Sequence, residues 1–236
     1  MVTGAEVGTG LKVAEFITRA APKGYELVKS WWSGKEFLVV GQARAGKTTF
    51  IEYLKYGFFD EARRTEETPE IERSGRFNVE LGRDKSLKLV IRNAVDVPGQ
   101  VGAVEHANLA FDRNPHAIIV ILDLTTPLNG DPDRASADWL ARFCRRLEAK
   151  WRADRKRKNR LVSLVVVMNK MDATNPEKPA LAEAAYREIL ESELRDARGR
   201  MIQPIAVLPT IMVKNANGSE RVDAVIRQLA QSFARS

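Results

Sequence analysis

The stretch "EFLVVGQARAGKTTF", residues 36–50, joins a continuous apolar run to two glycines, a lysine and two threonines. The apolar run is typical of a buried strand, and the residues from Gly41 to Thr48 fit the phosphate-loop pattern G-x-x-x-x-G-K-S/T. Glycines let successive backbone N–H groups point at phosphates, and the helix that begins near Gly46 presents its positive dipole end to them. The stretch therefore predicts a phosphate-binding loop between a strand and a helix.

Individual residues of this loop have separate expected roles. Lys47 is expected to reach the β- and γ-phosphates of a nucleotide and to assist catalysis there, and the Thr48 hydroxyl is expected to ligate Mg²⁺. The backbone and side chains around them complete the predicted phosphate site, which consists of Gly41, Gln42, Ala43, Arg44, Ala45, Gly46, Lys47, Thr48 and Thr49.

The bulk composition limits the class of protein. A chain of 236 residues allows one sizeable α/β domain with an appendage. The single cysteine, Cys144, excludes a disulfide framework, and His106 and His116 are too separated to indicate a metal cluster. No run reaches the roughly 18–20 apolar residues of a membrane span, and no secretory signal is evident, so we expect a cytoplasmic protein. The net charge of +7 fits either an anionic partner or a solvated surface.

Strand-like and helix-like segments alternate along the chain, which predicts a doubly wound, mostly parallel α/β sheet of six strands. The expected strands are 36–40, 77–81, 87–97, 117–124, 161–169 and 204–210. Helical patterns cover about 46–57, 135–158, 178–198 and 219–234. The short gap between the second and third strands indicates a hairpin, and hence one antiparallel edge strand. Residues 1–35 are expected to form an N-terminal extension of short helices outside the main domain, residues 36–236.

A second chemical element, "DVPGQ" at 96–100, follows the long apolar run that begins at Leu87. Because it stands at the C-terminal end of a strand downstream of a phosphate loop, we expect the Asp96 carboxylate to hold Mg²⁺ through a water. The Gly99 amide is expected to bond the γ-phosphate. Gln100 would then lie within reach of the attacking water, which makes it a candidate catalytic residue.

A third element, "NKMD" at 169–172, follows the most apolar strand. The Asp172 carboxylate can accept hydrogen bonds from N1–H and the 2-amino group of guanine, and adenine offers neither donor. Asn169 is expected to bond N7 of the base or to brace the phosphate loop, and the Lys170 stem to lie over the purine. The three elements follow one another at spacings of 49 and 73 residues, which predicts a guanine nucleotide site.

With these motifs, the chain resembles the Ras-superfamily small GTPases, and "GQARAGKTT" and "FNVEL" are most similar to Arf-like and bacterial Ras-like members. The resemblance covers about residues 36–235 and implies a six-stranded P-loop G-domain that binds GTP and GDP with Mg²⁺. It also implies switch loops near 58–76 and 96–112, slow GTP hydrolysis, and an effector or activating protein as partner. The alternative is a constitutively nucleotide-bound structural or adaptor subunit with negligible hydrolysis.

Two motifs depart from the family pattern. The first switch should supply a threonine that ligates Mg²⁺, and the segment 63–77 offers Thr65 and Thr68. We favour Thr68, because Thr-Pro ahead of a Phe-Asn-Val-Glu strand resembles the Arf arrangement. In place of the usual Ser-Ala-Lys motif the chain reads "TIMVKNANG", so Val213 and Lys214 are the candidates for backbone contacts to guanine.

Arg44 occupies a loop position at which small Ras-like GTPases usually have a small residue. Guanylate-binding-type GTPases resemble this chain here, and in them the arginine acts as a finger when two copies pair. The resemblance makes Arg44 a candidate catalytic residue, because an arginine can neutralise charge on the transferred phosphoryl group. The alternative is that Arg44 points to solvent or pairs with a nearby carboxylate.

The segment 145–160 is helix-like and ends in four adjacent basic residues at 155–158. It fits the solvated C-terminus of a helix, which favours cations. It also fits a surface that docks an anionic membrane or an acidic protein, which would place the protein at the periphery of a membrane. A nucleic acid is the least favoured partner, because RNA-binding GTPases usually carry an additional domain and this chain has no room for one.

Overall fold

The structure is a computed structural model that describes part of the chain. This part comprises residues 35–56, 72–73, 77–81, 87–96, 101–131, 134–157, 160–195, 206–209 and 222–229. Of the expected N-terminal extension, only Lys35 lies within it. The expected first switch, 58–76, lies outside it except for Glu72–Arg73.

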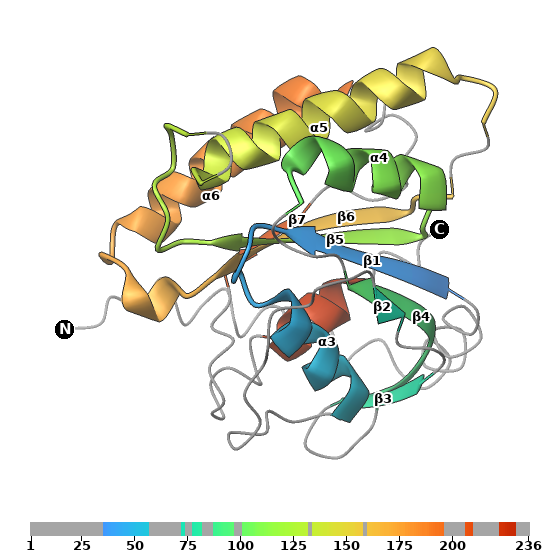
Figure 1. The fold of residues 1–236 in the computed structure, drawn as a ribbon. Helices are drawn as coiled ribbons and strands as arrows, with labels where there is room; N and C mark the ends of the chain where they lie inside the picture. Colours follow the sequence, from blue (N-terminus) through green and yellow to red (C-terminus); the bar gives the residue numbers. More distant parts are fainter. Residues whose placement is uncertain are drawn as a thin grey trace, which may run out of the picture.

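The described strands form one sheet of seven strands, in the order β2-β4-β1-β5-β6-β7, with β3 also paired to β4 (Figure 1). Their bounds are Lys35–Gly41 (β1), Glu72–Arg73 (β2), Phe77–Leu81 (β3), Leu87–Asp96 (β4), Ala117–Asp123 (β5), Ser163–Asn169 (β6) and Ala206–Pro209 (β7). The central and later strands pair in parallel, whereas β2 and β3 run antiparallel to β4. The predicted α/β fold with a parallel sheet is confirmed. The sheet has one strand more than the six predicted, because the two-residue β2 pairs with the end of β4.

Helices cover both faces of the sheet. Their bounds are Lys47–Tyr56 (α3), Ala103–Arg113 (α4), Ser136–Ala153 (α5) and Lys178–Glu193 (α6), and residues 222–229 are also helical. Figure 1 shows α4, α5 and α6 on one face, and α3 with the red helix at 222–229 on the other. No helix in the described ranges combines the length and the apolar character needed to cross a membrane.

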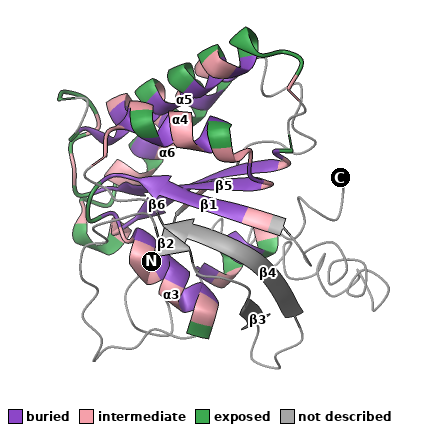
Figure 2. Cartoon of the chain, turned by 45° about the vertical axis from the view of Figure 1, so that its right-hand side comes forward, coloured by how far each residue is buried: buried purple, intermediate pink, exposed green. Residues whose placement is uncertain are grey.

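Two apolar clusters, one on each face, explain why the central strands are continuous Val/Ile/Leu runs. Leu38, Ile118 and Val166 belong to the cluster that packs under α4, α5 and α6. Phe37 and Ile119, which are their neighbours along the strands, belong to the cluster that packs against α3 and the helix at 222–229. Successive strand residues point to opposite faces, so a sheet covered on both sides needs apolar residues at every position. Figure 2 shows the resulting burial in purple along β1 and β5.

The loop that we expected at 96–112 is largely the helix α4, so that expectation was wrong from Ala103 onward. The segment contains neither glycine nor proline between Ala103 and Arg113. Small side chains at Ala103, Ala107 and Ala110 lie on the face that packs against the core, where they let the helix approach the sheet closely. The helix ends at Arg113, and the cap residue Asn114 donates its N–H to the Ala110 carbonyl and has a left-handed backbone (φ 49°) that ends the helix.

Two predicted helices end earlier than their patterns indicated. The helix α5 ends at Ala153 rather than at 158, because Asp154 leaves the helical conformation and its carboxylate accepts the Arg157 N–H at 3.2 Å. The basic residues from 155 onward therefore lie beyond the helix. The helix α6 ends at Glu193 rather than at 198.

Candidate functional site

The predicted phosphate loop connects β1 to α3 at the carboxyl edge of the parallel strands, where ligand sites of such sheets form. Three of its residues have a positive φ: Gly41 (146°), Arg44 (57°) and Gly46 (98°). A Cβ built on Gly41 would lie 1.9 Å from the Ile121 carbonyl oxygen of β5. The first glycine of the pattern is therefore required both by its backbone angle and by the closeness of the neighbouring strand.

Lys47 begins α3 and turns its buried side chain back under the loop. Its Nζ donates to the Gly41 carbonyl at 3.2 Å and to the Gln42 carbonyl at 2.7 Å. A buried ammonium needs such acceptors, and here they hold the charge at the start of the loop. The half-buried Thr48 and Thr49 follow in the first turn of α3, where backbone N–H groups and the helix dipole favour an anion.

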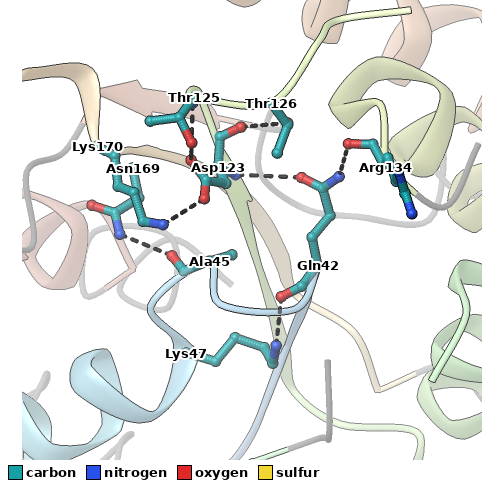
Figure 3. Close-up of polar contacts among 9 residues, drawn as sticks. All are labelled: Gln42, Ala45, Lys47, Asp123, Thr125, Thr126, Arg134, Asn169 and Lys170. Atoms are coloured by element: carbon teal, nitrogen blue, oxygen red, sulfur yellow. Dashed lines mark hydrogen bonds and ion pairs between the residues drawn. The ribbon is translucent and has the colours of Figure 1, made fainter. Parts of the chain in front are cut away.

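The Gln42 side chain ties the loop to the end of β5. Its Nε2 donates to the Arg134 carbonyl at 2.8 Å, and its Oε1 accepts the Asp123 N–H at 3.4 Å (Figure 3). The sequence pattern places Gln42 in the predicted phosphate site but does not indicate that its side chain contacts the end of β5.

His106 connects α4 to the first residue of the loop. Its ring is fully buried, and its Nδ1 accepts the Gly41 N–H at 3.3 Å. Since Nδ1 accepts here, the ring proton lies on Nε2 in the neutral form. The ring also packs edge-on against Trp139 at 5.4 Å between centroids. Sequence reasoning considered His106 only as a metal ligand and missed this contact.

The "NKMD" segment begins at the last residue of β6 and lies beside the phosphate loop (Figure 3). The buried Asn169 side chain donates through Nδ2 to the Ala45 carbonyl at 2.8 Å, so of its two expected roles the structure contains the brace to the loop. Lys170 has a left-handed backbone (φ 61°), and its Nζ lies 2.5 Å from Asp123 Oδ2. Asp172 stands in a short 3₁₀ turn, Met171–Ala173, with its side chain exposed.

Asp123 is a site residue that sequence analysis did not identify. It ends β5, and its Oδ1 accepts both the Thr125 N–H at 2.9 Å and the Thr125 hydroxyl at 2.6 Å. Its other oxygen accepts from Lys170, so the buried charge is balanced by an ammonium and by two further donors. The available signal was an acidic residue at the end of the otherwise apolar run "AIIVILD".

Other predicted site residues are described only in part or not at all. Asp96 ends β4, and its backbone is paired with Val39 of β1, two residues before the loop begins. Arg44 lies on the loop with its side chain exposed. The predicted residues outside the described ranges are Thr65, Thr68, Gly99, Gln100, Val213 and Lys214.

Two buried groups on the α5–α6 side of the sheet have raised pKa values. Burial raises the pKa of Tyr186 to about 12, the Asp123 carboxylate adds to the increase, and the hydrogen bond to Ser136 opposes it. Burial also raises the pKa of the Cys144 thiol, with smaller contributions from nearby glutamates. Both groups are therefore neutral near pH 7, and the Cys144 thiol is not activated as a nucleophile.

The basic segment 145–160 makes several contacts within the chain. The Arg145 guanidinium bonds Glu193 at 2.6 Å, and the Arg157 guanidinium lies 4.4 Å from the centre of the Phe111 ring. Arg152 pairs with Glu148, and Arg160 contacts His116. The exposed Arg155 and Lys156 extend from the turn after α5. Several residues of this basic segment thus contact other parts of the chain, Arg145 at α6 and Arg157 at α4.

No protein-family model matches the chain, and no curated protein matches it. Among solved structures it is similar to bacterial selenocysteine-specific elongation factor EF-Sec, at 18% identity and a TM-score of 0.50, over 84% of this chain and 29% of that chain. It is also similar to elongation factor SelB from Methanococcus maripaludis in complex with the GTP analogue GppNHp, at 16% identity and a TM-score of 0.48, over 84% of this chain and 34% of that one. The chain thus spans about a third or less of these proteins. The similarity to the first shows a shared α/β fold with a parallel sheet.

Proposed function

We propose that this chain is a guanine nucleotide-binding domain that depends on Mg²⁺ and hydrolyses GTP to GDP and phosphate. One contact carries the proposal, the hydrogen bond from Asn169 of the "NKMD" segment to Ala45 of the phosphate loop, 124 residues away along the chain. It brings the predicted base-reading segment beside the predicted phosphate-binding segment. The motif resemblance to Arf-like and bacterial Ras-like GTPases supports the same assignment.

Phosphate binding follows from the loop and the start of α3. Backbone N–H groups from Ala43 to Thr49 and the helix dipole attract the phosphates. The Lys47 ammonium is already held at the loop by two carbonyl oxygens, from which it can turn to the β- and γ-phosphates. An anion bound there would be neutralised without any large movement of the lysine.

Base selection is assigned to Asp172 and Lys170. The Asp172 carboxylate is exposed at the rim of the site, where it can accept from the two donors that guanine presents on one edge. With adenine these acceptors would lose their partners, and a lost hydrogen bond to a charged group costs about 1.5–3 kcal/mol. Val213 and Lys214 would add backbone contacts to the guanine.

The residues present fit a Mg²⁺ ion. Magnesium prefers hard oxygen ligands, and the chain offers the Thr48 hydroxyl at the start of α3, which follows β1, and the Asp96 carboxylate at the end of β4, which pairs with β1. Thr68 is proposed as the third ligand from the first switch. When bound, the ion would neutralise charge on the β- and γ-phosphates.

Hydrolysis requires little covalent chemistry from the protein. Gln100 would orient a water whose oxygen bonds the γ-phosphorus, while the bond from that phosphorus to the bridging oxygen breaks. Lys47 and Arg44 would neutralise the charge that collects on the phosphate oxygens. The segments near 58–76 and 96–102 would act as switches that respond to the γ-phosphate, and α4 follows the second of them.

An effector or an activating protein is the proposed partner, and the cytoplasm is the proposed location. Within the segment 145–160, the exposed Arg155 and Lys156 are the residues that we propose for docking to an anionic membrane or an acidic protein. Such docking should weaken as salt is added, because exposed charges are screened over about 8–10 Å at 0.1–0.15 M salt.

The test is a nucleotide titration of the purified protein and of the variant Asp172→Asn. We expect the wild type to bind GDP and GTP far more tightly than ATP, and to lose affinity when Mg²⁺ is chelated. Asp172→Asn should lose GTP affinity and gain affinity for xanthosine triphosphate, because xanthine has a carbonyl where guanine has its 2-amino donor. Equal affinity of the wild type for ATP and GTP would refute the assignment.

A second measurement separates the enzyme from the adaptor. If the protein is a switch, single-turnover GTP hydrolysis should be faster than GTP release, and Gln100→Ala should slow it. Tight nucleotide binding with no measurable turnover, in the wild type as in Gln100→Ala, would identify the constitutively bound adaptor instead.

A further inference from the structure

We propose that Asp123 is a positioning residue for the purine base: its carboxylate holds the Lys170 ammonium so that the lysine stem is ordered before a nucleotide binds. The inference rests on the proposed function, since it assumes that Lys170 lies over a purine. It assigns a role to a buried charge that belongs to none of the three predicted motifs.

The position of Asp123 in the sheet gives it access to both nucleotide-binding segments. It ends β5, which lies between β1 and β6. Its backbone is in register with Asn169 of β6, and Ile121, two residues earlier, is in register with Gly41 of β1. The last residue of β5 is therefore placed between the phosphate loop and the "NKMD" segment, as Figure 3 shows.

The two oxygens of the Asp123 carboxylate have different partners. Oδ1 accepts the N–H and the hydroxyl of Thr125, and Oδ2 lies 2.5 Å from Lys170 Nζ. The two bonds to Oδ1 fix the plane of the carboxylate, so Oδ2 is held toward the lysine. The Asp123 side chain is 6% exposed and the Lys170 side chain 37% exposed, so water screens this pair less than it screens a surface ion pair.

Both the backbone and the side chain of Lys170 are constrained. Its backbone is left-handed, with φ 61° and ψ 34°, which directs the side chain away from the course of β6. Its ammonium is then held at Asp123, and the stem between these two fixed points is ordered. A long lysine side chain otherwise loses much rotamer freedom on binding a ligand, so ordering it beforehand strengthens binding.

The main chain of Asp123 has a separate role that a substitution of the side chain leaves intact. The Asp123 N–H donates to Gln42 Oε1, and Thr126 donates its hydroxyl to the Asp123 carbonyl. The variant Asp123→Asn keeps these bonds and the size of the side chain. It removes the negative charge, and with it the acceptor strength that holds the lysine.

The experiment is a double-mutant cycle on nucleotide affinity with wild type, Asp123→Asn, Lys170→Met and the double variant. We measure the dissociation constants of GDP and inosine diphosphate, which share a purine face and differ in the 2-amino group. Asp123→Asn should weaken both nucleotides by the same factor, about 3- to 10-fold. In the Lys170→Met background, it should have no further effect.

Asp138→Asn is the matched control, because that carboxylate bonds the Gly130 N–H in the same region without contacting the lysine, and its affinities should stay at the wild-type values.

A purely structural role for Asp123 predicts a different pattern. Asp123→Asn would then cause the same loss with Lys170 or Met at position 170, and that additivity would overturn the inference, as would an unchanged affinity.

Thr125→Val, a change at an exposed residue, provides a second variant that leaves the buried carboxylate in place. It should weaken binding by about 2- to 3-fold with Lys170 present and not at all in Lys170→Met. A wild type that binds no purine nucleotide would overturn the proposed function itself, which distinguishes the two failures.

Discussion

Gly41→Ala is the substitution that tests most directly how the start of the phosphate loop is built. The alanine Cβ would stand 1.9 Å from the Ile121 carbonyl oxygen and 2.9 Å from its carbonyl carbon. Both are backbone atoms of the fully buried β5, so no flexible side chain can move aside. The loop and the strand would have to separate by roughly 1 Å, and φ at this position is 146° in the native backbone.

The expected loss of stability follows from three contributions. A backbone angle that L-residues rarely adopt costs about 1–3 kcal/mol. Overpacking against the neighbouring strand adds about 1–3 kcal/mol. Alanine lowers the conformational entropy of the unfolded chain relative to glycine, which offsets about 0.4–1 kcal/mol of this loss. The free energy of unfolding should therefore fall by about 1–6 kcal/mol, a large part of the 5–15 kcal/mol of a typical domain.

The chain contains a matched control for this prediction. Gly130 has a similar φ of 136°, but a Cβ there would have no atom within 4 Å. Gly130→Ala should therefore show the backbone strain without the collision, a loss of about 0–3 kcal/mol. The assay is urea unfolding followed by circular dichroism for both variants and the wild type. If Gly41→Ala and Gly130→Ala unfold within 0.5 kcal/mol of each other, a value at the precision of the method, the collision with β5 is refuted.

Four further predictions concern the site and the core. Thr48→Asn should leave a protein that prefers GDP over GTP or is free of nucleotide, because Mg²⁺ loses a hydroxyl ligand, and a titration with and without Mg²⁺ measures this. If Arg44 acts as a finger, the wild-type single-turnover rate should rise with protein concentration, and Arg44→Ala should abolish that rise at unchanged nucleotide affinity; equal rates at every concentration would exclude the finger. His106→Leu should lower the free energy of unfolding in urea by about 1–3 kcal/mol because it leaves the buried Gly41 N–H unpaired, and His106→Asn, which offers an acceptor near the same place, should restore most of it. The thiol of Cys144, buried and with a raised pKa, should react with an aromatic disulfide only as fast as the protein unfolds, so rapid reaction in native buffer would contradict its placement.

Much of the sheet was predictable because it depends on local apolar pattern. Continuous runs such as "AIIVILD" and "SLVVVMN" are buried at every position, and only a strand covered on both faces needs such composition. The loop between β1 and α3 was predictable from its glycines, and the structure gives a reason for the first of them, since a Cβ at Gly41 would collide with the backbone of β5. The helix pattern at 219–234 was confirmed in its described part, where Val222, Val225, Ile226 and Leu229 are buried.

The helix α4 was not predicted, because the family resemblance implied a switch loop at 96–112 and the apolar pattern of this segment is weak. Three of its five buried residues are alanines, which contribute little to an apolar periodicity although they are good helix formers. The strand β2 was missed because two residues carry no pattern, and Glu72–Arg73 pairs only through its partner β4. The helix end at Ala153 was missed because it depends on one carboxylate, that of Asp154.

The site residues that sequence reasoning missed share one property: each acts on a distant part of the chain through a single polar group. His106 bonds Gly41 across 65 residues, and Asp123 binds Lys170 across 47. Neither separation follows a helix or strand repeat. The Asp123–Lys170 pair depends on β5 lying beside β6, and the His106–Gly41 pair depends on α4 packing against β1. A buried polar residue must nevertheless find a partner, because an unpaired one costs about 1–3 kcal/mol. An acid that ends an apolar strand therefore indicates that a donor lies at the same edge of the sheet, and here that donor is the lysine of the segment expected to read the base.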